Sequence, residues 1–230
     1  MKKVFFFSMM AAVAMMASCG KGGPSENSAV NEAIAAAEKE APLKESPVLG
    51  QLPSICAQLK AAQKSVKEAI KPLESENAKE ASAKGDDLKA ATEELNKIYA
   101  GKVAEEAKKL DGKSIKVNFD NEYFSDVKAT LKAVKTETTF GSVAIELKMT
   151  LAKALPKSKY GGVAFLWNWK YMDAQDKEVR GGAGSVDNSD PAISLKEGEV
   201  WTYTIDAANV PSSIEAGSKF DHLYIGKPEP

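Results

Sequence analysis

Residues able to act as nucleophiles, bases or zinc ligands are few in this sequence. His222 is the only histidine, and Cys19 and Cys56 are the two cysteines. A hydrolytic triad needs a histidine beside its nucleophile, and a structural zinc site takes four cysteine or histidine ligands. His222 also alternates with Phe220 and Tyr224, so a structural histidine on a strand is expected. The sequence therefore predicts neither an enzyme nor a zinc centre.

Oxygen-bearing side chains gather in two polar segments. They are Asp173, Asp176, Glu178, Asp187, Asn188 and Asp190. Their spacing is not that of an EF-hand, and Asp and Asn are ordinary turn residues, so turns are favoured over a calcium site. The segment GGAGSVDNSD lacks the Lys-Ser/Thr pair and following helix of a phosphate-binding loop. No cofactor and no metal are predicted.

Cys19 is explained by the residues before it. Two lysines precede an apolar run at 4–17, which is the order of a secretory signal and too short to span a bilayer. Ala17, Ser18 and Cys19 resemble the last three positions of a bacterial lipobox, where signal peptidase cuts before a lipidated cysteine. The resemblance implies a signal peptide at 1–18 and a membrane anchor through acyl chains on Cys19. An ordinary signal that leaves a free thiol at Cys19 is the alternative.

The residues after Cys19 bear on location within the cell envelope. Gly20 is not the aspartate that marks inner-membrane retention in some lipoproteins, and CGKGG lacks the acidic run of a surface-export signal. The predicted location is therefore the periplasmic face of the outer membrane. The membrane, an envelope protein or a glycan are the expected partners.

Charge is balanced along the chain. There are 31 Lys and Arg against 32 Asp and Glu, and loss of Lys2 and Lys3 with the signal leaves a formal charge of −3. Arg180 is the one arginine, so the planar fork that grips phosphates and base edges is nearly absent. Nucleic-acid binding is disfavoured. Cys56, the only other cysteine, lies in a helical pattern and is interpreted as a buried thiol, with an intermolecular disulfide as the alternative.

Aromatic residues divide the chain near Gly112. Tyr99 is the only aromatic residue between Cys19 and Gly112, and all three tryptophans follow Gly112. The first part is rich in Ala, Lys and Glu, which favour helices. The sequence therefore predicts a flexible tether at 19–27, a helical region at 28–112 and a β-sandwich at 113–230.

The helical region is expected to form a hairpin, stalk or small bundle. A first helix is predicted over 28–40, a second begins with Ser54 as its N-cap, Pro72 interrupts the pattern, and Gly85 marks a stop and restart before Gly112 ends the last helix. A groove for a partner helix or an oligomeric coiled coil is the alternative. The two apolar stripes are Ile55, Leu59, Ala62, Val66 and Ala69, and Leu88, Ala91, Leu95 and Ile98.

After Gly112 the apolar period becomes two, which is typical of strands. Turn-rich stretches such as DAQDK, GGAGSVDNSDP and LKEGE separate the strands, and about six or seven of them fit an antiparallel sandwich. The predicted strands lie at 115–119, 127–134, 143–151, 163–171, 200–205 and 220–225.

A family resemblance supports this fold class. WKYMDAQDKEV followed by ISLKEGEVWTYTI resembles bacterial extracytoplasmic immunoglobulin-like domains of the FxLYD kind, in which an aromatic strand ends in Asp and turns back through a polar hairpin. Trp169, Tyr171, Met172 and Asp173 occupy the motif, and Asp176 stands where a turn glycine is common. The resemblance implies an immunoglobulin-like β-sandwich with a binding or spacer role.

Large aromatic residues on one strand face are the most conspicuous candidate for binding. Trp167, Trp169 and Tyr171 alternate on one strand and Trp201 lies on another. Such rings normally form the core between sheets, and a stacking platform for sugar rings is the alternative. Exposure of a tryptophan beside a concavity would favour the platform. The expected function is a membrane-anchored extracytoplasmic lipoprotein whose helical stalk carries a noncatalytic interaction module; a carbohydrate- or small-ligand-binding lipoprotein is the alternative.

Overall fold

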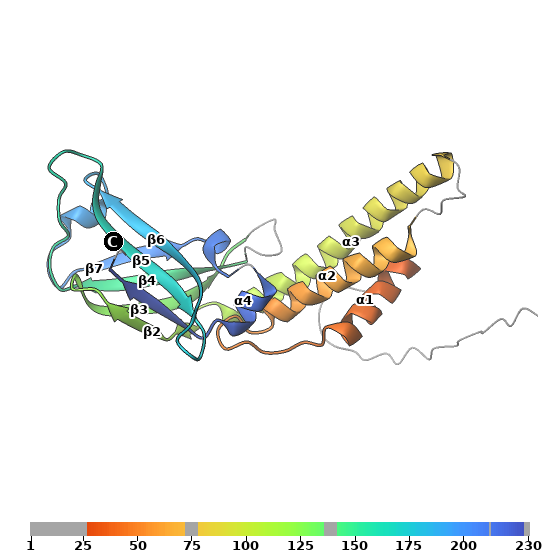
Figure 1. Cartoon of the computed structure of the whole chain (residues 1–230), viewed down its shortest axis with the longest axis horizontal. Helices are drawn as coiled ribbons and strands as arrows, with labels where there is room; N and C mark the ends of the chain where they lie inside the picture. The colour runs from red at the N-terminus through yellow and green to blue at the C-terminus, as the bar shows by residue number, and fades with distance from the viewer. Residues whose placement is uncertain (1–26, 72–77, 136–141, 212, 228–230) are drawn as a thin grey trace, which may run out of the picture.

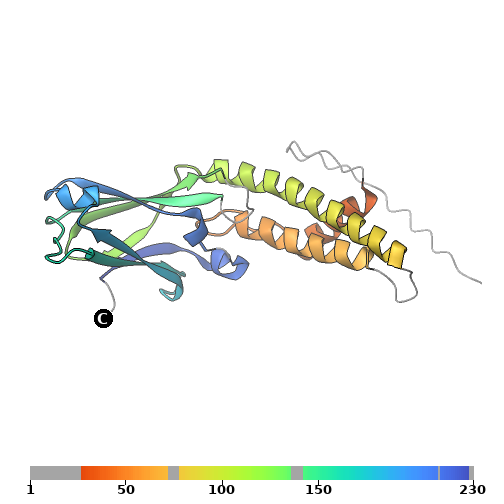
Figure 2. The same cartoon turned by 90° about the horizontal axis from the view of Figure 1, so that it is seen from above.

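Helices come first along the chain and strands follow, as predicted. The computed structural model describes residues 27–71, 78–135, 142–211 and 213–227. Helices α1 (Ser28–Glu40), α2 (Leu52–Ala69) and α3 (Ala78–Leu110) pack side by side and project from one end of two β-sheets (Figures 1 and 2). The signal peptide, Cys19 and the interruption at Pro72 lie outside the described residues.

The first helix has the predicted bounds, and the second begins earlier than predicted. The Asn27 side chain caps α1 by accepting a hydrogen bond from the Ala29 N–H. Helix α2 begins at Leu52, and no side chain caps it. Pro53 favours a start here, because the first turn of a helix has no intrahelical partner for an N–H and the proline lacks that group. Ser54 instead exchanges two hydrogen bonds with the backbone of Lys44. The prediction of Ser54 as N-cap was wrong.

Helix α3 runs without a break through Gly85, so the predicted stop there was also wrong. Gly85 is exposed, with open space where a Cβ would stand. A helix-interior glycine costs only about 1 kcal/mol relative to alanine, which packing elsewhere along the helix offsets. The predicted end is confirmed: α3 stops at Leu110, and Gly112 turns the chain with φ +77° while its N–H donates to the Leu131 carbonyl.

The helices bury a narrow, alanine-rich core of their own. Tyr99 is fully buried in it, and burial raises the pKa of its hydroxyl to about 12. No helix in the described part of the chain is long and apolar enough to cross a bilayer. The other buried residues of this core include Val30, Ala33, Ala37, Ile55, Leu59, Ala62, Val66, Ala91, Leu95 and Val103.

Two four-stranded sheets form the rest of the described chain. One has the order β1-β3-β4-β7 and the other β2-β8-β5-β6, and every pair is antiparallel except the parallel pair β2–β8. A short helix, α4 (Ile214–Lys219), precedes the last strand. The strands are β1 (Ser114–Ile115), β2 (Val117–Asp120), β3 (Phe124–Ala133), β4 (Val143–Leu151), β5 (Val163–Met172), β6 (Glu178–Asp187), β7 (Val200–Ile205) and β8 (His222–Gly226).

Strand β6 lies in a segment that the sequence assigned largely to turns. Two of its glycines face indole rings of β5: a Cβ on Gly182 would stand 2.1 Å from the Trp169 ring, and one on Gly184 would stand 2.2 Å from the Trp167 ring. Gly182 pairs with Trp169 and Gly184 with Trp167 across the ladder. These glycines make room for the rings, which is a known use of glycine within strands.

The two sheets face each other (Figure 2), and aromatic rings pack between them. Trp167 on β5 contacts Trp201 on β7 with ring centroids 5.9 Å apart, and Phe124 on β3 contacts Phe165 on β5 at 6.1 Å. Both pairs meet edge to face, a preferred geometry of aromatic rings. Burial of these rings and of the aliphatic residues around them, such as Leu131, Ile145 and Leu147, stabilises the packing of the sheets.

The helices dock onto one end of the sheets. The turn before α2 requires a glycine, because Gly50 has φ +54° and a Cβ there would stand 2.5 Å from Glu106 Oε1. The same Oε1 accepts a hydrogen bond from the Gln51 N–H, so the α1–α2 connection is fastened to α3. Leu49 and Ile214 then line the contact between the start of α2 and α4, and one buried cluster includes residues from both parts.

We predict that residues 111–230 fold alone in a cooperative transition, whereas residues 19–110 alone are only marginally helical. The sheets hold almost all the large rings, and a fragment starting at Asp111 keeps the hydrogen bond from the Ala133 N–H to Asp111 Oδ1. The fragment should be less stable than the whole chain, since apolar contacts with α2 are lost. Circular dichroism and tryptophan fluorescence during urea unfolding check this; a β fragment that is unfolded without the helices contradicts it.

Candidate functional site

The aromatic residues singled out in the sequence lie inside the protein. Trp167 and Tyr171 are 0% exposed, Trp169 is 4% exposed and Trp201 is 5% exposed. Trp167 contacts Tyr203 with ring centroids 4.9 Å apart, and Trp169 and Tyr171 lie 5.0 Å apart. The rings therefore form core, and the exposure that would have favoured a sugar-stacking platform is absent at these four residues. Their burial leaves a ligand site on this face without support.

The opposite face of the same strand carries a groove. Outward-facing residues of β5 form one wall, while Gly181 and Ala183 on β6 leave space beside them, giving a volume of about 370 Å³. That volume is within the usual range for small-ligand sites. The remaining lining residues are Leu166, Trp167, Asn168, Trp169, Lys170, Glu178 and Gly182.

Polar groups in this groove suit a neutral polar ligand. Lys170 Nζ and Glu178 Oε2 form an ion pair at 3.2 Å, so the two charges offset each other. Asn168 also lines the groove, but its buried Oδ1 lies toward Gly226 on β8, where a Cβ would stand 2.5 Å from it. Leu166 adds an apolar surface, being 45% exposed. From the sequence, this face of β5 was expected to be an ordinary solvated surface. The only sequence feature that indicates a groove is the small size of Gly181 and Ala183 on the neighbouring strand.

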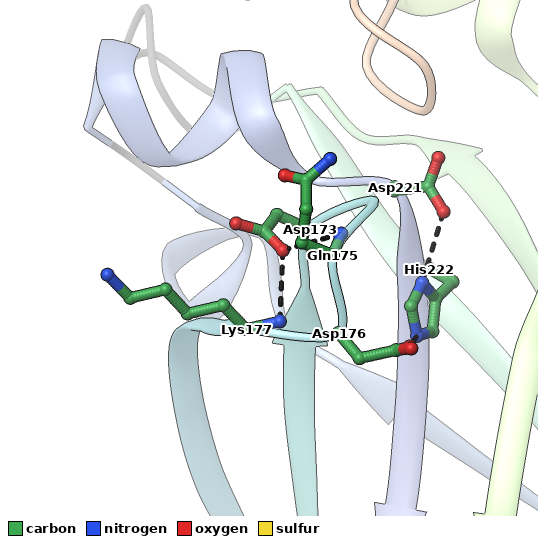
Figure 3. A network of polar contacts seen from close by, with 6 residues as sticks. All are labelled: Asp173, Gln175, Asp176, Lys177, Asp221 and His222. Atoms are coloured by element: carbon green, nitrogen blue, oxygen red, sulfur yellow. Dashed lines mark hydrogen bonds and ion pairs between the residues drawn. The ribbon is translucent and has the colours of Figure 1, made fainter.

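His222 is buried at one end of the same sheet, between two carboxylates. Its Nδ1 lies 3.1 Å from Asp221 Oδ2 and its Nε2 lies 3.1 Å from Asp176 Oδ1 (Figure 3). The side chain is 3% exposed. With both ring nitrogens in contact with carboxylates, this imidazole joins the β5–β6 turn to β8. The expectation of a structural histidine agrees with this placement.

The β5–β6 turn itself is held by Asp173. Its Oδ1 accepts hydrogen bonds from the N–H groups of Lys177 and Gln175, both at 2.9 Å (Figure 3). These donors, Lys177 first, keep the pKa of Asp173 below its ordinary value. Asp176 has φ +58°, the left-handed conformation in which a glycine is common and which Asp tolerates better than most residues. Asp176, which stands where a turn glycine is common, thus adopts the left-handed backbone conformation that a glycine would adopt.

The oxygen-bearing side chains act in two separate turns. Asp173 and Asp176 precede β6, whereas Asp187 ends it, and ten strand residues span about 33 Å. Asp187 accepts a hydrogen bond from the Ser189 N–H, and Asp190 caps the short helix at Pro191–Ser194. In the ranges that the structure describes, no three His, Cys, Asp or Glu side chains are placed to hold a metal ion.

Cys56 lies on α2 at the contact between the helices and the sheets. It is 6% exposed, borders a cavity of about 30 Å³, and burial raises the pKa of its thiol to about 11. A thiol in this state is unreactive near neutral pH. Cys19, the predicted lipidation site, lies outside the described residues.

Comparison of the chain with protein-family models, curated proteins and solved structures gave no match. No family membership is assigned, and the chain's own residues carry the functional inference.

Substitution of Gly184 tests the packing that turns the aromatic residues inward. In Gly184→Ala the new methyl would collide with the Trp167 ring, and we expect the free energy of unfolding to fall by about 1–3 kcal/mol. Gly181→Ala is the matched control, since its methyl would meet the end of the flexible Glu178 side chain at 2.9 Å and the Trp169 carbonyl oxygen at 3.3 Å, and no ring. Urea unfolding followed by tryptophan fluorescence measures both. Equal stability of the two variants would show that the indole does not press on β6.

Proposed function

We propose that the protein is an extracytoplasmic lipoprotein, anchored by acyl chains on Cys19, whose sheets serve as a noncatalytic interaction module of the cell envelope. The observation that carries the proposal is the order of two lysines, an apolar run, small residues and a cysteine at 2–19. A buried imidazole between two carboxylates and a buried Cys56 thiol offer no exposed nucleophile or base, which is in keeping with a noncatalytic role.

The arrangement of the helices suits an anchor at this end of the chain. Helix α1 starts toward the end of the bundle that is remote from the sheets (Figure 1). The Gln58 side chain donates to the Ala41 carbonyl, which places the end of α1 beside the second turn of α2. Helix α3, with 33 residues, is about 50 Å long. An anchored chain would thus have its sheets separated from the anchor by most of the bundle.

The proposed fold of the sheets is immunoglobulin-like. Two packed, mostly antiparallel sheets with an inward tryptophan support it. The strand order differs: the sheets have the orders β1-β3-β4-β7 and β2-β8-β5-β6, whereas the sheets of a constant-type immunoglobulin domain have the orders ABED and CFG. We therefore propose that the two sheets share the sandwich architecture of immunoglobulin domains but not their strand order.

Cys19→Ser tests the anchor. In a bacterial host fed labelled palmitate, we expect the unchanged protein to take up label and to fractionate with membranes, and Cys19→Ser to give an unlabelled, uncleaved precursor. Cys56→Ala is the control and should be labelled normally, because Cys56 is buried in the folded chain. Normal labelling and processing of Cys19→Ser would overturn the proposal.

A second candidate function is binding of a neutral sugar or similar polyol in the groove on the outer face of β5 and β6. The exposed Leu166 side chain and the Lys170–Glu178 ion pair that lines the same groove favour this, since sugars present apolar C–H faces and hydroxyl groups. This groove, rather than the buried tryptophans, is where such a ligand would bind.

Titration with a panel of neutral monosaccharides and disaccharides tests this candidate. We expect one of them to shift the Asn168 side-chain amide signals in a saturable way by NMR, and Ala183→Trp, which fills the groove, to abolish the shift. Leu43→Trp, at an exposed position outside the groove, is the control. If no sugar perturbs Asn168, or if Ala183→Trp leaves binding intact, the groove is not the site.

A further inference from the structure

Helix α2 carries a row of lysines on the side away from its core. Lys60, Lys64 and Lys67 follow one another at spacings of four and three, which puts them on one helix face, and Lys71 comes two residues after the helix ends. All four side chains are exposed. We call these four residues the lysine face. The opposite side of α2 holds the buried residues Ile55, Leu59, Ala62 and Val66.

The lysine face has more positive than negative charge in the part of the chain that the structure describes. Among the described residues, its four ammonium groups form none of the ion pairs, which engage other lysines such as Lys102 and Lys109. Glu68, the only acidic residue within α2, lies on the same side, four residues after Lys64 and three before Lys71, and offsets one of the four charges. In a chain with a net charge of −1, this side of α2 still carries an excess of positive charge. Such a patch attracts an anionic surface.

The position of the proposed anchor indicates that this anionic surface is the bilayer itself. The nine residues from Cys19 to Asn27 span at most about 30 Å, so the start of α1 stays within that distance of the bilayer. Helix α1 packs along the half of α2 that is remote from the sheets, which brings Lys67 and Lys71 to the same end of the bundle (Figure 1). Nucleic acid is a poorer occupant, because the lysine face contains no arginine.

We propose that the lysine face binds the anionic headgroups of the bilayer in which the chain is anchored, so that the helical bundle lies against the membrane. The inference rests on the proposed lipid anchor. Each lysine near an anionic membrane strengthens binding about fivefold at low salt, and four together strengthen it by more than a hundredfold. The acyl chains would hold the protein in the membrane, and the lysine face would fix how the bundle and the sheets lie on it.

The test uses the mature full-length chain carrying Cys19→Ser, so that binding by lysines is measured without acyl chains. Co-sedimentation with vesicles of phosphatidylcholine containing 30 mol% phosphatidylglycerol should show binding at 50 mM salt, weakening at 500 mM, and none to pure phosphatidylcholine. Changing all four lysines of the lysine face to glutamine should reduce binding at least tenfold. Glutamine has a similar helix propensity, and circular dichroism should confirm that the fold is kept.

A control variant separates the lysine face from net charge. It changes four exposed lysines in the connections between strands to glutamine and should keep most of the binding: Lys135, Lys157, Lys159 and Lys196. Equal losses in the two variants, equal binding to pure phosphatidylcholine, or no binding to either vesicle would overturn the inference. The proposed anchor is tested separately by palmitate labelling at Cys19, so it stands or falls on its own.

Discussion

The packing of two indole rings onto two glycines determines the arrangement of the sheets. Trp167 lies over Gly184 and Trp169 over Gly182, so the larger residues of β5 and the smallest residues of β6 share the inner face. Trp167 then reaches Trp201 on the other sheet. A side chain larger than hydrogen at either glycine would have to displace a ring that is almost completely buried. The close approach of the two sheets depends on this match of large and small residues.

The same alternation shapes the outer face. Because inward positions of β5 are taken by aromatic rings, Asn168 and Lys170 are directed outward, and the small residues Gly181 and Ala183 lie beside them. The groove is thus a consequence of how the core is built. At the end of the sheet that lies beside α4, His222 and the Asp176 turn join β5, β6 and β8 (Figure 3). Where the helices meet the sheets, Glu106 and Gly50 fasten the α1–α2 connection to α3.

Sequence reasoning succeeded where one strong local pattern decided the structure. The period-two run on β5, the helix at Ser28–Glu40 and the end of the helices before Gly112 are such cases. It failed where tertiary contacts decide. Gly85 is tolerated inside α3 because packing elsewhere holds the helix, and the glycines of β6 resemble turn residues until the rings of β5 are placed beside them. The groove could not be predicted, since it depends on residues of two strands meeting in space.

The helices, the sheets and the lysine face can be explained together if the chain is held by its amino terminus at a membrane. Charge on α2, the place where α1 begins, and the polar outer groove on the sheets are then features of one surface-bound protein. Intact-mass spectrometry of the protein purified from membranes tests this most directly. The account predicts a mature chain that begins at Cys19 and is heavier than the unmodified polypeptide by the mass of its acyl groups. An unmodified Cys19, or a chain beginning at another residue, would contradict it.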